Sequence, residues 1–169
     1  MKMAFFHGLD SSPQGTKGRL LMERYPGIYV PLLPADINER LRIVENDIRE
    51  PMLIIGSSLG GLTALLFAMK HPELVKGLIL LAPAVGFFDR TILNSEQSNA
   101  LDSLYVPAGL KTFIIAGIRD EVIPLAAVRA MVDRSPEPRE ITLHEVDDDH
   151  NLHDHLDFML SCIDKELGI

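Results

Sequence analysis

The stretch Met52-Leu53-Ile54-Ile55-Gly56-Ser57-Ser58-Leu59-Gly60 decides the fold. Its apolar start predicts a buried β-strand, and the mainly apolar residues 61–68 that follow predict a buried helix. Glycines at 56 and 60 allow the strand to turn sharply into the helix around Ser58, which leaves the serine Oγ exposed at a helix N-terminus. This context predicts that Ser58 is a nucleophile; a structural Gly/Ser turn that caps the helix is the alternative.

Outward from this stretch, short apolar runs alternate with longer amphipathic ones, a pattern typical of α/β proteins. Strands are expected at 3–6, 28–31, 52–55, 77–81, 112–116 and 140–146. Helices are expected at 17–24, 38–49, 59–70, 125–132 and 152–167. Right-handed crossovers between them give a mostly parallel sheet of about six strands with helices on both faces. Ligands of such a sheet bind at the carboxyl ends of its strands.

The segment 84–108 interrupts this alternation with Pro, Gly, Asn and Ser among scattered apolar residues. We interpret it as a short lid-like excursion within a single domain of residues 1–169, and an ordinary surface excursion is the alternative. Its large apolar side chains are candidates for a substrate pocket beneath the lid, although plain packing explains each of them equally well. These candidates are Phe87, Phe88, Leu93 and Tyr105, with Leu101 and Leu104 beside them.

The acid and the base of a serine nucleophile are expected after it in the chain, in that order, each just past a strand. Asp120 follows the strand 112–116 and is the predicted acid, with Glu121 as the alternative. His150 is the first histidine after the last strand and is the predicted general base. His153 is the reserve base, because it falls in the helix that follows.

The oxyanion hole needs two backbone N–H groups directed at the developing alkoxide. Leu59, the residue after the nucleophile, supplies one of them. The second is expected from Leu9, because His7-Gly8 comes directly after the first strand and glycine lets the backbone turn there. A plain turn with Ser11 or Ser12 capping the next helix is compatible with this interpretation.

The composition of the chain limits the classes of partner that it can bind. A net charge of −8 at 169 residues disfavours nucleic acid and acidic membrane surfaces. The single cysteine, Cys162, excludes an intramolecular disulfide, and no apolar run is long enough to span a bilayer, so a cytoplasmic location is expected. The acidic and histidine-rich tract 147–155 raises the alternative of a metal site. It lacks the paired histidines with glutamate that mark a metalloprotease helix, and a metal would leave Ser58 unexplained, so no metal and no cofactor are expected.

These motifs together resemble the α/β-hydrolase superfamily, and in particular its small bacterial esterase branch of YqiA-like proteins. The similar stretches are 7–13, the turn 56–60, 71–83, 120–124 and the pair at 149 and 150. The resemblance implies a three-layer α/β fold with a minimal lid. It also implies a triad of Ser58, Asp120 and His150, with Leu59 and Leu9 as oxyanion donors.

The chemistry that follows is hydrolysis of a small-molecule carboxylic ester or thioester through an acyl-enzyme on Ser58. The same triad also suits a cofactor-free lyase, a perhydrolase or an acyltransferase, because a fold does not fix the reaction. A non-catalytic binding protein of the fold is the remaining alternative.

Overall fold

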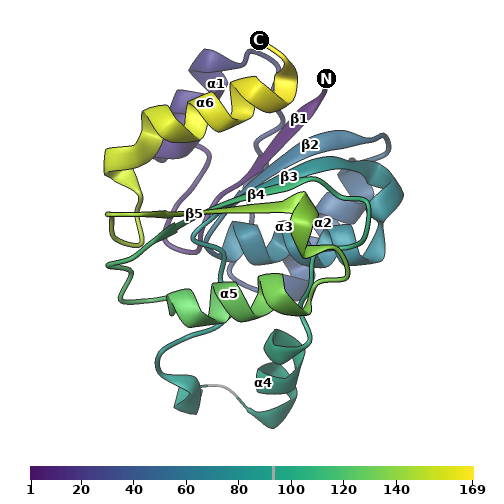
Figure 1. Ribbon diagram of the computed structural model, residues 1–169. Helices are drawn as coiled ribbons and strands as arrows, with labels where there is room; N and C mark the ends of the chain where they lie inside the picture. Colours follow the sequence, from purple (N-terminus) through teal and green to yellow (C-terminus); the bar gives the residue numbers. More distant parts are fainter. Residues whose placement is uncertain (93) are drawn as a thin grey trace.

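Five parallel strands form the central sheet of the computed structural model, which describes residues 1–92 and 94–169 (Figure 1). The strands lie in chain order, and each neighbouring pair is parallel. Their bounds are β1 Met3–Phe6, β2 Met52–Ser57, β3 Val75–Leu81, β4 Thr112–Gly117 and β5 Ile141–Val146. The first four are almost wholly buried, as expected for strands that helices cover on both faces.

The helices form two layers, one on each face of the sheet (Figure 1). Side chains at alternate strand positions point to opposite faces. Ile54 and Leu78 therefore join a core with α2, α3 and α5, whereas Ile55 and Ile79 join a second core with α1 and α6. The helix bounds are α1 Thr16–Arg24, α2 Ile37–Asp47, α3 Leu59–Lys70, α4 Ser95–Asp102, α5 Leu125–Arg134 and α6 Leu156–Leu167. Short 3₁₀ turns span Pro72–Leu74, Arg90–Ile92, Pro138–Glu140 and His153–His155. The predicted three-layer α/β architecture is confirmed.

One predicted strand, 28–31, is wrong. Only Tyr29 pairs with the sheet, through a single parallel bridge to Ala4 beside β1. Its N–H donates to the Met3 carbonyl, and its carbonyl accepts from the Phe5 N–H, both at 2.9 Å. Pro31 has no N–H to extend the ladder, so the pairing ends after one residue.

The last helix also begins later than predicted. Residues 153–155 form a 3₁₀ turn, and α6 starts at Leu156. Leu152 precedes that turn with a left-handed backbone (φ 54°), which a residue inside an α-helix does not adopt. The consequence is a longer loop after β5, in which His150 lies.

The excursion 84–108 holds a 3₁₀ turn and α4, which Figure 1 shows on the far side of α5 from the sheet. Leu101 and Leu104 are buried in the core shared with α2, α3 and α5, so they pack as structural residues. Leu93 lies outside the described residues. Within the part of the chain that the structure describes, no helix is long and apolar enough to cross a membrane.

The order of the strands places a crevice beside β1. From β1 the chain passes through α1 to the bridge at Tyr29, and then returns through α2 to β2 on the other side of β1. Such a reversal of direction separates the loops at the carboxyl ends of adjacent strands and opens a binding crevice between them. Here those loops are the ones after β1 and β2, because Phe6 and Gly56 pair at the strand ends.

Candidate active site

Ser58 lies in the sharp turn between β2 and α3. Its backbone has a φ of 54° and a ψ of −117°, a conformation that non-glycine residues adopt only under strain. Three hydrogen bonds hold it there: its N–H donates to the Leu81 carbonyl at 2.9 Å, and its carbonyl accepts from the N–H groups of Leu62 and Ala84. The neighbouring backbone therefore fixes the turn that presents Oγ at the N-terminus of α3.

The glycines of the turn are required by close packing. A Cβ on Gly60 would lie 1.9 Å from the Phe6 carbonyl oxygen, and a Cβ on Gly56 would lie 2.5 Å from the Gly60 carbonyl oxygen. Both distances are far below any tolerated contact, so only glycine lets the start of α3 sit against the end of β1. This contact brings the loop after β1 next to Ser58.

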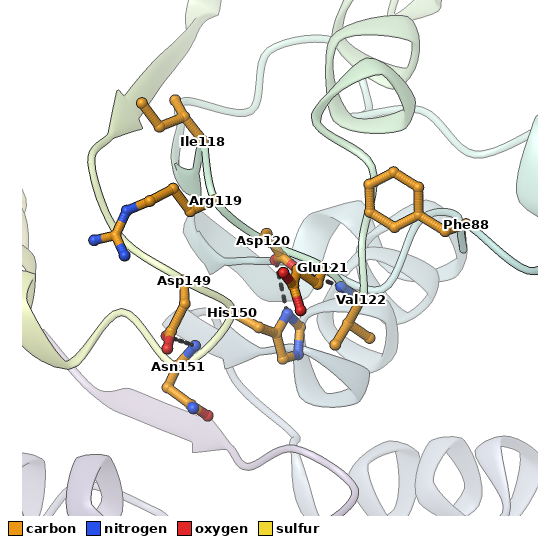
Figure 2. A pocket seen from close by; sticks show the side chains of 9 residues that line it. All are labelled: Phe88, Ile118, Arg119, Asp120, Glu121, Val122, Asp149, His150 and Asn151. Atoms are coloured by element: carbon orange, nitrogen blue, oxygen red, sulfur yellow. Dashed lines mark hydrogen bonds and ion pairs between the residues drawn. The ribbon is translucent and has the colours of Figure 1, made fainter.

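The three residues predicted as a triad converge on one point. His150 Nε2 lies 2.9 Å from Ser58 Oγ, and His150 Nδ1 lies 2.7 Å from Asp120 Oδ2. Figure 2 shows Asp120 and His150 facing each other across the loops after β4 and β5. With the Nδ1 proton donated to the carboxylate, Nε2 has a free lone pair to accept the serine proton. The reserve base, His153, is exposed. Among the residues that the structure describes, the histidine that hydrogen-bonds to Ser58 is His150 and not His153.

Asp120 is held as a buried carboxylate. Its other oxygen, Oδ1, accepts from the N–H groups of Val122 and Ile123 at 2.8 Å each. Burial alone would raise the pKa of this carboxyl, but the hydrogen bonds from His150, Ile123 and Val122 outweigh it and hold the pKa below its usual range. The group therefore stays negative beside the imidazole at neutral pH. The carboxylate that hydrogen-bonds to His150 is that of Asp120 and not that of Glu121, the alternative acid.

A second carboxylate fixes the loop that contains His150. Asp148 is 3 % exposed and accepts from the N–H groups of Asp149 and Asp154 and from His155 Nδ1, at 2.8 to 3.0 Å. Burial alone would raise the pKa of the Asp148 carboxyl. The hydrogen bonds outweigh this effect, and the pKa lies below its usual value. The loop is thus tied at both ends around His150, and His155 serves as a structural partner.

The loop after β1 lies where an oxyanion donor is needed. A Cβ on Gly8 would lie 3.4 Å from Ser58 Cβ and 4.0 Å from Ser58 Oγ. Leu9 and Leu59 both line the same cavity as Ser58. Among the described residues, neither of their N–H groups donates to a protein acceptor, which leaves both available to a bound substrate.

Two cavities meet at His150. One, of about 780 Å³, contains Ser58 and extends along residues 8–17. The other, of about 840 Å³, shares Val122, His150 and Asn151 with the first and is lined by the residues labelled in Figure 2. Phe87 lines the first and Phe88 the second, whereas Tyr105 lines neither. Of the described residues in the excursion 84–108, Ala84, Phe87 and Phe88 at its start line the cavities, and α4 contributes no lining residue to either.

Two residues that the sequence did not single out, Lys17 and Arg40, lie at or near this site. Lys17 brings a cation into the cavity of Ser58, where its Nζ donates to the Asn151 carbonyl. Burial lowers the pKa of Lys17, although Asp148 and Asp149 oppose this. Arg40 is fully buried behind the loop after β1. Its position gives a sequence signal, because it falls on the apolar face of its helix with Ile37 and Val44.

After β5, His150 pairs with Asp120 and His155 pairs with Asp148. Among the residues that the structure describes, no group of three or more His, Cys, Asp or Glu side chains is placed to hold a metal ion.

Comparisons with known proteins agree with this architecture. Residues 33–104 match the family model described as serine aminopeptidase, S33. A segment of 51 residues is 53 % identical to the chloroplastic pheophytinase of Arabidopsis thaliana; it covers 29 % of this chain and only 10 % of that protein.

Solved structures match over almost the whole chain. Mouse alpha/beta hydrolase domain-containing protein 10 is 18 % identical, with a TM-score of 0.79 over 99 % of this chain and 89 % of its own. A candidate hydrolase of the alpha/beta superfamily from Xanthomonas campestris pv. campestris is 24 % identical, with a TM-score of 0.75 over 99 % and 98 % of the two chains. At these identities the likeness shows the fold.

Proposed function

Because this chain is an α/β-hydrolase-fold protein, we propose that it is a serine hydrolase that cleaves carboxylic ester or thioester bonds. The observation that supports this most strongly is the continuous chain of two hydrogen bonds from Asp120 through His150 to Ser58. A serine hydroxyl is a weak nucleophile on its own, and a base that is itself oriented by a carboxylate activates it.

In the proposed reaction, Ser58 Oγ attacks the carbonyl carbon while His150 Nε2 takes the hydroxyl proton. Asp120 stabilises the resulting imidazolium, and the N–H groups of Leu59 and Leu9 bind the oxyanion of the tetrahedral intermediate. As the intermediate collapses, His150 returns the proton to the leaving alcohol or thiol. Water then attacks the acyl-enzyme by the same steps and releases the acid and free Ser58.

The two cavities suggest how a substrate lies across the site. Both are lined by His150, which must hand its proton to the leaving group, so each cavity is a candidate for one side of the scissile bond. Exposed apolar side chains line them, among them Leu9, Phe88 and Val122. We propose a small acyl ester or thioester as the substrate.

Steady-state hydrolysis of p-nitrophenyl esters of increasing acyl length tests the proposal. We expect Ser58→Ala to lower kcat by about 10⁴-fold or more, because the nucleophile is lost. Ser161→Ala, which removes an exposed hydroxyl on α6, should keep wild-type turnover. Acyl thioesters and aminoacyl anilides complete the panel. The anilides are included because residues 33–104 match a family model described as serine aminopeptidase. Full turnover by Ser58→Ala would reject the mechanism.

A further inference from the structure

Arg40 is a buried cation that binds backbone carbonyls. It is 0 % exposed, on the inner face of α2. Its guanidinium donates to the carbonyls of His7 at 2.7 Å, Gly8 at 3.2 Å and Pro34 at 2.5 Å. No carboxylate within the described part of the chain forms an ion pair with it. A buried charge without a counter-ion is costly, and here the three backbone carbonyls are the groups that compensate it.

His7, at the start of the same loop, contacts the Gly8 carbonyl as well. It is 1 % exposed, its Nε2 accepts from the Leu33 N–H at 3.0 Å, and its Nδ1 lies 2.8 Å from the Gly8 carbonyl oxygen. An Nε2 that accepts a hydrogen bond leaves the ring proton on Nδ1, which then donates to Gly8. The Gly8 carbonyl is thus held by two donors, one from Arg40 and one from His7.

These donors determine where the Leu9 N–H points. In a planar trans peptide the carbonyl and the N–H lie on opposite sides, so fixing the Gly8 carbonyl also fixes the Leu9 N–H. Arg40 and His7 hold that carbonyl toward the protein interior. The Leu9 N–H therefore faces the opposite way, on the side where the loop meets Ser58 and lines its cavity.

We propose that Arg40 is a positioning residue for the oxyanion hole: its guanidinium fixes the carbonyls of His7 and Gly8 and thereby directs the Leu9 N–H at the oxyanion. The proposal rests on the serine hydrolase mechanism. A rigid donor is worth more than a mobile one, because it needs no reorganisation as charge develops in the transition state. Arg40 should consequently affect kcat and leave KM almost unchanged.

Arg40→Lys tests this, because an ammonium keeps the charge but cannot reach three carbonyls in the planar fork of a guanidinium. We expect kcat for a p-nitrophenyl ester to fall by about tenfold to a hundredfold, less than complete loss of an oxyanion donor, with KM little changed. Val44→Ala is the matched control: it weakens the packing of the same helix one turn later and leaves the loop contacts intact. It should lower Tm and keep kcat.

Two further measurements separate positioning from folding. Free guanidinium at millimolar concentration should restore part of the kcat of Arg40→Ala. His7→Gln places an amide oxygen where Nε2 accepts from Leu33 but loses the donor to Gly8, so it should also lower kcat at unchanged KM, even where Arg40→Lys does not fold.

The outcomes that overturn the proposal are distinct from those that overturn the hydrolase mechanism. Wild-type kcat in Arg40→Lys, or a loss of kcat that Val44→Ala reproduces at equal Tm, shows that Arg40 is structural only. Wild-type kcat in both His7→Gln and guanidinium-free Arg40→Ala shows that holding the Gly8 carbonyl does not direct the Leu9 N–H. Turnover that does not depend on Ser58 instead rejects the proposed function itself.

Discussion

At the scale of single residues, the site combines strain with hydrogen bonds that support it. Ser58 has an unfavourable backbone conformation, and the carbonyl of Leu81 and the N–H groups of Leu62 and Ala84 keep it in place. Its Oγ then meets His150, which a buried Asp120 orients. Each contact depends on the one before it, so changes along the chain of hydrogen bonds should act on turnover far more than on substrate binding.

Replacing Asp120 by Asn tests the orientation of the base. The amide can donate to Nδ1, which favours the imidazole tautomer with its proton on Nε2, and that tautomer cannot accept the serine proton. We expect kcat to fall by about 10⁴-fold with KM little changed, measured by steady-state ester hydrolysis. Glu121→Gln, one residue further on, should have a much smaller effect. A larger loss in Glu121→Gln than in Asp120→Asn would assign the acid to Glu121.

At the scale of elements, the loop between β5 and α6 is organised around a buried side chain. Asp148 binds two backbone N–H groups and His155, and this network spans the segment that presents His150. Asp147, its neighbour, is exposed and pairs with Arg119 at the surface. The two aspartates are adjacent in sequence and should differ strongly in their contribution to stability.

Asp148→Ala should lower the free energy of unfolding by about 2–3 kcal/mol, because it leaves three part-buried donors without their acceptor. It should also lower kcat, since the loop no longer holds His150. Asp147→Ala should cost less than about 1 kcal/mol, as is usual for exposed ion pairs. Urea denaturation of both variants checks this, and equal losses would mean that Asp148 does not fix the loop.

The contact between α3 and β1 gives a second test at this scale. Gly60→Ala places a methyl group 1.9 Å from the Phe6 carbonyl oxygen, so helix and strand must separate. We expect a loss of about 3 kcal/mol or more in urea denaturation. A Cβ on Gly77 meets a Leu53 methyl at 3.3 Å, which can move aside, so Gly77→Ala should stay within about 1 kcal/mol of wild type. A tolerated Gly60→Ala would contradict the tight packing behind Ser58.

At the scale of the whole molecule, stability should depend on pH through His7. Burial lowers the pKa of His7 from 6.5; the hydrogen bond to Gly8 opposes the shift, and the charge of Arg40 adds to it. The folded state therefore binds the proton more weakly than the unfolded chain. Stability is full above pH 6.5 and is lost as the pH falls below it toward the folded-state pKa.

Urea denaturation at pH 7.5 and pH 5 measures this effect. The free energy of unfolding should fall between the two pH values, and it should fall less in His7→Gln, which cannot take up the proton. The remaining histidines are common to both proteins, so the difference between them isolates position 7. An identical pH dependence would mean that His7 is not held neutral by the fold.

Local sequence patterns predicted most of the strands and the positions of the site residues. The features that they did not predict depend on contacts between residues far apart in the chain. Apolar runs identified all five strands because parallel strands are buried on both faces. The segment 28–31 is similarly apolar, but it forms a single bridge to β1 because Pro31 has no N–H to continue the pairing. The extent of this pairing depends on how the chain returns to β1. The positions of Ser58, Asp120 and His150 followed from motif and chain order. The carbonyl contacts of Arg40 did not, because no local pattern specifies which backbone groups a buried guanidinium will meet.

The most direct test of the central claim is covalent labelling with a fluorophosphonate probe, followed by intact mass and peptide mapping. An activated serine attacks such a probe and an inert turn does not. We predict one adduct per chain, on the peptide that contains Ser58, with labelling lost in Ser58→Ala and strongly slowed in His150→Ala. An unlabelled wild-type protein, or an adduct on another residue that persists in Ser58→Ala, would contradict the account.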